Sequence, residues 1–99
     1  MDNGDIMADD KETYYVQSGK AKIKDVGHDK ALYVGDQKAV HVLNRSAYFI
    51  YEAMKEPISF EELVEVILEV TDGDEKAIRE DLKETIALFL KYDFIKTAE

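Results

Sequence analysis

The stretch Lys38–Met54, KAVHVLNRSAYFIYEAM, decides the fold that we predict for this chain. Its first part, Ala39–Leu43, is rich in residues that favour a pleated strand, and Gly35-Asp36 just before it is typical of a turn. Asn44 offers a short side-chain acceptor to the free amides at the start of a helix. One face of that helix repeats at the i, i+3, i+4, i+7 spacing: Ala47, Ile50, Tyr51 and Met54. We therefore predict a strand that passes into an amphipathic helix with almost no loop.

Two further strands are predicted ahead of this stretch. In Ala21–Lys24, charged and apolar residues alternate as in a half-exposed strand, and Ala31–Val34 is a second run of strand-forming residues. The four residues 35–38 suit a hairpin loop that returns the chain into Ala39–Leu43. Together with Tyr14–Val16 near the start, this half of the chain is predicted to form a small antiparallel meander.

Two more helices are predicted after the first one. Pro57 excludes Glu56 from the helical region and so ends the first helix. Ser59 and Glu62 have the S-x-x-E spacing of a capping box, which predicts a helix over 59–71. The apolar stripe of that helix is Phe60, Leu63, Val64, Ile67 and Leu68, and the outward residues are Glu61, Glu62, Glu65 and Glu69.

The longest helix is predicted over about residues 75–92, with Asp74 as its N-cap. We expect its buried face to be Ile78, Leu82, Ile86, Phe89 and Leu90, and the apolar pair Phe94-Ile95 to fold back on the core. A weaker line at helical spacing, which is a candidate border of a groove, is Asp81, Thr85, Leu88 and Tyr92. Strands first and helices after them predict an α+β fold, a small three-stranded antiparallel sheet followed by three helices in a winged-helix-like order.

Composition limits the function. The 99 residues suit one domain, predicted over 13–99, and the acidic start, residues 1–12, is predicted to be a disordered tail. Twenty-two acidic against 13 basic residues give a charge of −9, which disfavours binding to a phosphate backbone. No segment is apolar enough for a membrane span or a signal peptide, and there is no cysteine. These features predict a cytosolic protein with no disulfide or thiolate site.

Catalytic and metal-binding patterns are not found in the sequence. His28 and His41 lie 13 residues apart on a predicted loop and strand, and a metal site there would need carboxylates as the remaining ligands. Acidic groups such as Glu80, Asp81 and Glu84 have the spacing of a solvated helix face beside basic residues. Phosphate-binding glycine loops and nucleophile elbows are also missing. We therefore expect a protein that is not an enzyme and that needs no cofactor or metal.

The order of elements and two short motifs resemble a known family. The first motif is Leu43-Asn44 opening a helix, and the second is Asp81-Leu82 followed by Phe89 and the terminal pair Phe94-Ile95. Over about residues 20–95 the chain resembles the PqqD-like family of peptide chaperones, also called the RiPP recognition element. It departs from that pattern at Asp93, where the family usually has glycine, and at Thr85, where it usually has a large apolar residue. The hairpin at Tyr33–Asp36 also lacks a proline often found there.

The resemblance implies a binding mode. Members of the family bind the leader of a ribosomally made precursor peptide as an added antiparallel strand, beside the third strand and against the third helix, and present it to a modifying enzyme. An unpaired strand edge is suited to such strand addition. By resemblance, the edge consists of Lys38, Ala39, Val40, His41, Val42 and Leu43, and the helical wall of Ile78, Asp81, Leu82, Thr85 and Phe89.

Several alternatives stay open at this point. Asp81 either holds an amide or cation of the leader or braces the helix against the sheet, and periodicity does not decide whether Val40 and Val42 or the residues between them face the core. The partner enzyme is expected to be a radical SAM maturase or a leader peptidase. The rival function is a winged-helix DNA-binding regulator or antitoxin-like module. A third alternative is a dimerisation module in which the same edge pairs with its own copy, and we expect a monomer or a weak homodimer.

Overall fold

The structure is a computed structural model that describes residues 13–35 and 40–98. The predicted tail over 1–12 and the predicted edge residues Lys38 and Ala39 lie outside the described residues. The elements, in chain order, are β1 (Tyr14–Gln17), β2 (Ala21–Val26), β3 (Asp29–Val34), β4 (Val40–Leu43), α2 (Arg45–Ala53), β5 (Ile58–Ser59), α3 (Phe60–Val70), α4 (Glu75–Lys91) and β6 (Ile95–Ala98).

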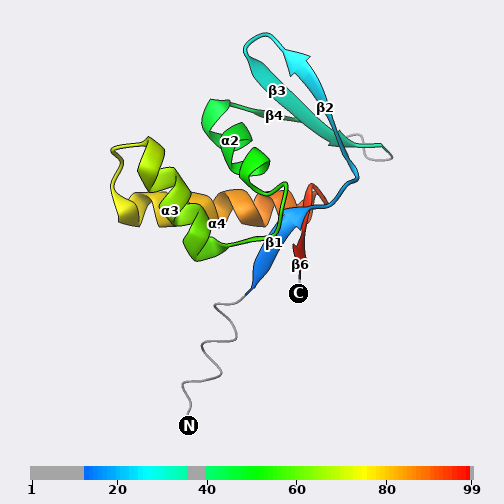
Figure 1. Ribbon diagram of the computed structural model, residues 1–99. Helices are drawn as coiled ribbons and strands as arrows, with labels where there is room; N and C mark the ends of the chain where they lie inside the picture. The colour runs from blue at the N-terminus through cyan, green and yellow to red at the C-terminus, as the bar shows by residue number, and fades with distance from the viewer. Residues whose placement is uncertain (1–12, 36–39, 99) are drawn as a thin grey trace.

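The predicted meander is confirmed for its last three strands, which form an antiparallel sheet in the order β2-β3-β4. Its predicted first strand, Tyr14–Val16, is a strand but does not belong to this sheet, because it pairs with β5 and β6 instead. In its register, Leu32 lies opposite Ile23 on one side and His41 on the other. Because side chains directly opposite each other point to the same face, these three share a face of the sheet. Figure 1 shows this sheet at one end of the molecule, above the helices, with β4 leading directly into α2. The α+β class is therefore confirmed, and winged-helix-like describes it only loosely.

A second sheet, in the order β5-β1-β6, was not predicted. The strand β1 pairs antiparallel with β6, which carries Ile95, and with the two residues of β5. The end of β1 also reaches the helices, since the amide of Gln17 donates to the carbonyl of Met54 at 2.8 Å and its side-chain Nε2 donates to the carbonyl of Tyr51 at 2.8 Å. The second sheet therefore fastens both ends of the described chain to the helical core (Figure 1).

The helices place the predicted apolar stripes on one core. On α4, Leu82, Ile86 and Phe89 are buried, but Leu90 is 38% exposed, so its predicted burial is wrong. Leu90 immediately follows Phe89, and the turn of about 100° per residue carries it away from the core. The largest side chains that are fully buried come from every layer of the fold: Phe89, Phe94, Leu32, Met54, Leu63, Leu82, Ile95 and Val64.

The helix caps follow the sequence prediction. Ser59 and Glu62 form the reciprocal capping box of α3, with bonds of 3.0 and 3.1 Å, and Asp74 accepts from the Ala77 amide at 3.1 Å. At the end of α4, Asp93 has a φ of 64°, the left-handed conformation expected at this position. The amide of Phe94 donates back to the Phe89 carbonyl at 2.8 Å, which completes a Schellman motif. The turn therefore forms without glycine and returns Phe94 to the core.

The core analysis predicts a large effect of Phe89→Ala. Phe89 is completely buried and packs edge-on against Tyr51, with ring centroids 5.9 Å apart. Its truncation should lower the free energy of unfolding by about 3–5 kcal/mol, measured by urea unfolding of the full chain. The adjacent Leu90→Ala is the matched control on the same helix and should cost less than about 1 kcal/mol, in the range typical of surface changes. Equal losses for both variants would contradict this description of the core.

Candidate functional site

The strand β4 has one paired and one free edge. It pairs with β3, and no other described strand pairs with it. Its inward residues are His41 and Leu43, of which Leu43 is buried, whereas Val40 and Val42 are 56% and 55% exposed. The structure thus settles which residues face the core. In an antiparallel ladder alternate residues direct their N–H and C=O groups away from the paired strand, so the free edge of β4 offers backbone donors and acceptors to another chain.

The free edge of β4 ends at the start of α2. The side chain of Asn44 accepts a hydrogen bond from the Ala47 amide at 2.9 Å, as predicted for an N-cap. The cap lets the chain turn from strand to helix within one residue, since Leu43 ends β4 and Arg45 begins α2. This tight junction places the first turn of α2 beside the end of the free edge.

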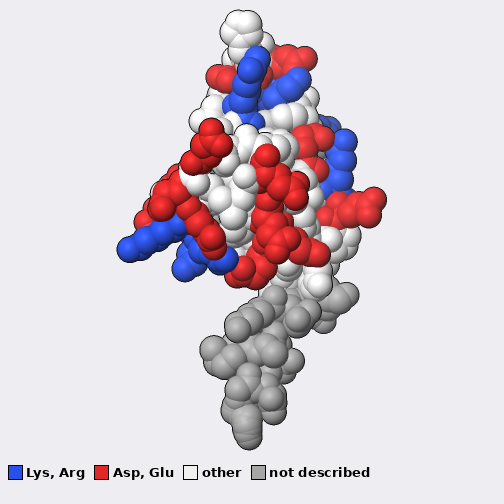
Figure 2. Space-filling view, turned by 60° about the vertical axis from the view of Figure 1, so that its left-hand side comes forward, with Lys and Arg blue, Asp and Glu red and all other residues white. Residues whose placement is uncertain are grey.

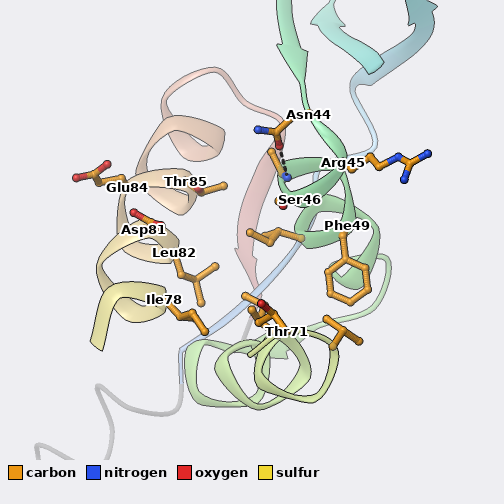
Figure 3. Close-up of a pocket in the computed structure, with 14 residues that line it drawn as sticks. Asn44, Arg45, Ser46, Phe49, Thr71, Ile78, Asp81, Leu82, Glu84 and Thr85 are labelled. Carbon is orange, nitrogen blue, oxygen red and sulfur yellow. Dashed lines mark hydrogen bonds between the residues drawn. The ribbon is translucent and has the colours of Figure 1, made fainter. Parts of the chain in front are cut away.

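A pocket of about 710 Å³ begins at this junction and extends between the three helices. Figure 3 shows Ile78, Leu82 and Thr85 pointing from α4 into the space that separates it from α2. Phe49 and Ile50 contribute from α2, and other lining residues come from the last turn of α3. The volume lies within the range of sites that bind small molecules or large side chains. The pocket therefore has a largely apolar interior and begins at the residue that follows β4.

The charged residues that line the pocket lie at its margins. Asp81 and Glu84 are on α4 and Arg45 is on α2, and all three are exposed. In Figure 3 the Arg45 side chain runs away from α4. Figure 2 shows acidic side chains crowded around an uncharged area on the side of the molecule that carries the α3–α4 connection. The α4 side of the pocket is consequently negative, whereas the α2 side carries the positive end of a helix.

His41 has an unusual environment on the inner face of β4. Its ring packs against Tyr92, with centroids 4.0 Å apart, and against the edge of Phe94 at 5.8 Å. Its Nε2 atom is buried and has no hydrogen-bond partner among the described residues. A buried polar atom without a partner lowers stability. His41 is therefore held by packing on aromatic rings, at an energetic cost.

A smaller hollow of about 330 Å³ lies on another side of α2, where Tyr48 and Glu52 are among the lining residues. A hydrogen bond to Glu52, together with burial, raises the pKa of Tyr48 to about 12. The same bond lowers the pKa of the Glu52 carboxyl, with help from Lys55. These two groups hold each other in place, and Lys30 lies over the Tyr48 ring at 5.7 Å. The contacts brace α2 against the β2-β3 hairpin.

The predicted site residues fall into three groups. Ile78, Asp81, Leu82 and Thr85 line the pocket together, as part of α4. Val40 to Leu43 form the adjoining strand, and Phe89 is completely buried in the core and does not line the pocket. The other residues that line the pocket were not predicted as site residues. They are Asn44, Arg45, Ser46, Ala47, Phe49 and Ile50 from the start of α2, Ile67, Val70 and Thr71 from the end of α3, and Glu84.

Two of the missed residues carried a detectable signal. Phe49 and Val70 are apolar but lie off the core stripe of their helices, and they are 38% and 63% exposed. Exposed apolar residues that meet in space mark binding surfaces more often than isolated ones do. Whether they line the same pocket depends on how α2 and α3 pack together, and the sequence periodicity of each helix gives no information about that packing.

The described residues contain neither a cluster suited to a metal ion nor a helix suited to spanning a membrane. Within residues 13–35 and 40–98, no group of three or more His, Asp or Glu side chains is arranged to hold a metal ion. No helix in the same part of the chain has the length and apolar character needed to cross a bilayer.

Comparisons with known proteins agree with the geometry. The sequence model of a family described as coenzyme PQQ synthesis protein D (PqqD) matches residues 30–95. A solved structure described as TbiB1 in complex with the TbiA(beta) leader peptide aligns with a TM-score of 0.70 at 15% identity, covering 82% of this chain and 94% of that one. At this identity the likeness shows a shared fold. A search of curated proteins finds no match.

The environment of His41 leads to a stability prediction. His41→Phe keeps the ring packing on Tyr92 and removes the unpartnered Nε2 atom, so it should raise the free energy of unfolding by about 1 kcal/mol in urea unfolding. The control is His28→Phe, because His28 is exposed, and it should change stability by less than about 0.5 kcal/mol. A destabilised His41→Phe would contradict the account in which the unpartnered Nε2 atom lowers the stability of the fold.

Proposed function

The chain belongs to the PqqD family, and from this we propose that it captures the leader of a ribosomally made precursor peptide by adding it as a strand to β4. The observation that carries the proposal is that β4, which no described strand pairs on its second edge, leads at Asn44 into the pocket beside α4. Strand addition needs an edge for the backbone and a pocket for side chains, and here the two are continuous. The fold shared with TbiB1, whose structure contains a leader peptide, supports the same interpretation.

Affinity and selectivity come from different parts of the site. Backbone hydrogen bonds to Val40–Leu43 can form with a leader of almost any sequence, whereas the pocket binds only side chains that fit it. The exposed Val40 and Val42 offer β-branched partners to cross-strand side chains of the leader, each pair contributing about 0.2–1 kcal/mol. The edge of β2 is less suited to this role, because the pocket begins at Asn44, the residue that follows β4, whereas neither β2 nor the residues next to it in the chain line the pocket.

The proposal describes a non-catalytic carrier with no cofactor of its own. Its second partner is the enzyme that modifies the precursor, for which a radical SAM maturase and a leader peptidase are the two candidates. A cytosolic location is part of the proposal, because a ribosomally made precursor is first available there. In this scheme a homodimer through β4 would compete with the leader, so leader binding should shift any weak dimer toward the monomer.

The rival function, DNA binding, has little physical support. The candidate recognition helices α3 and α4 carry exposed glutamates, which repel phosphates, and the chain as a whole has a charge of −9. Retention on DNA at low salt is the condition most favourable to such binding. Clear, salt-sensitive retention there would favour the rival function over leader capture.

The direct test is a titration of isotope-labelled protein with the precursor leader encoded beside its gene. We expect the amide signals of β4 and of residues 78–85 to shift together and saturate, because both walls of the site contact the peptide. Signals of β6, on the second sheet, serve as the internal reference and should stay in place. Leader binding that leaves the signals of Val40–Leu43 unchanged would contradict strand addition at this edge.

A substitution in the pocket tests the helical wall. Thr85 is half-buried and points into the pocket (Figure 3), so Thr85→Gln introduces an amide that a bound apolar side chain would leave without a partner. Since an unsatisfied buried polar group costs about 1–3 kcal/mol, leader affinity should fall by about tenfold or more, measured by fluorescence anisotropy. The matched control is Ala87→Gln on the exposed side of α4, which should bind as the unmodified chain does. Equal affinities for all three proteins would exclude this pocket from the leader site.

A further inference from the structure

The geometry fixes which end of a bound leader meets the pocket. The strand β4 runs from Val40 toward Leu43, and the pocket begins at Asn44, just past its end. A chain that pairs antiparallel with β4 runs in the opposite direction, so it enters at the Asn44 end and leaves at the Val40 end. The pocket must therefore take side chains that precede the paired segment of the leader, and the part to be modified leaves beyond Val40.

The interior of the pocket suits one large apolar side chain. Ile50, Ile67 and Ile78 are half-buried, and Leu82 is buried at 1% exposure, so branched aliphatic groups from three helices face the hollow. About 710 Å³ leaves room for an aromatic or long aliphatic side chain together with the backbone that carries it. Burial of such a side chain contributes about 1.5–3 kcal/mol, which makes it the main anchor of the leader.

The α4 margin of the pocket is suited to a cation. Asp81 lies one turn from both Ile78 and Thr85, which point into the pocket (Figure 3), and it is itself an exposed lining residue of the α4 margin. Among the described residues, neither Asp81 nor Glu84 forms an ion pair or a side-chain hydrogen bond, unlike Glu61 and Glu75, which both hold Arg79. Two carboxylates that line one margin therefore remain available to a ligand.

We propose that the pocket selects leaders in which a large apolar residue, with a lysine or arginine within two positions of it, precedes the segment that pairs with β4, and that Asp81 recognises the cation. This inference rests on the proposed function and adds to it the chemical class and the order of the recognised residues. It assigns Asp81 a specificity-determining role and leaves Glu84 as a second contributor to the negative margin.

The pocket also has a positive margin, on the side of α2. Arg45 and the first-turn amides of α2 form the positive side of the pocket and would favour a leader carboxylate. In Figure 3, however, the Arg45 side chain runs away from α4, and Asn44 already accepts from the Ala47 amide of that turn. A leader side chain held against Ile78, Leu82 and Thr85 lies within one turn of Asp81 along α4, so its neighbours in the leader pass the α4 margin.

The test is selection of binders by the full chain from an mRNA-displayed library of random 15-residue peptides. Enriched peptides should share a large apolar residue, a nearby lysine or arginine, and then a β-branched segment. Synthetic pairs that differ only by lysine or glutamine at the basic position should differ about two- to fivefold in affinity, the range of an exposed ion pair, and the difference should shrink in high salt.

Charge reversal supplies the decisive comparison. Selection by Asp81→Lys should enrich aspartate or glutamate at the same position, whereas selection by the control Glu80→Lys, an exposed site that does not line the pocket, should still enrich a cation. Enriched peptides with no charge preference, or with an acid in place of the cation, would overturn this inference and leave leader capture standing. If no peptide is enriched and the encoded leader also fails to bind, the proposed function itself is wrong.

Discussion

Burial of one face of α4 is the constraint on which the rest of the structure depends. Leu82, Ile86 and Phe89 belong to the same core as Leu32 of the first sheet and Ile95 of the second. A domain of this size buries little apolar surface in total, so a single helix that contacts both sheets accounts for much of its stability. The left-handed turn at Asp93 then directs the chain after α4 into the same core. The helix also packs against α3 and β6.

One face of α4 packs in the core, and the neighbouring face lines the pocket. Phe89 is buried, whereas Thr85 and Asp81 lie progressively farther toward solvent and line the hollow beside α2. The N-cap at Asn44 brings the free edge of β4 to the same place. The site therefore combines a helix with an incomplete sheet, and in the proposed binding mode a peptide that completes the sheet also reaches the helix. Such preorganisation lowers the entropic cost of ordering the site on binding.

Much of the fold was predictable because it depends on local patterns. The caps at Asn44, Ser59 and Asp74 and the apolar stripes of α3 and α4 follow from spacing alone. The second sheet was not predicted, because β5 has only two residues and pairs with a strand more than forty positions earlier. The inward direction of His41 was also open, since both sides of β4 are largely apolar. Four residues of α4 that were named through the family resemblance line the pocket, but the lining residues of α2 and α3 could not be named without knowledge of how these helices pack.

The central claim is that a leader peptide becomes a new antiparallel strand on the free edge of β4. The most direct measurement is of nuclear Overhauser effects between the backbone of β4 and an isotope-labelled leader at saturation. The account predicts close contacts between α-protons of the two strands in antiparallel register, with the residues that precede the paired segment in contact with Leu82 and Thr85. Contacts confined to β2 or to the second sheet, or a leader that binds without extended pairing, would contradict it.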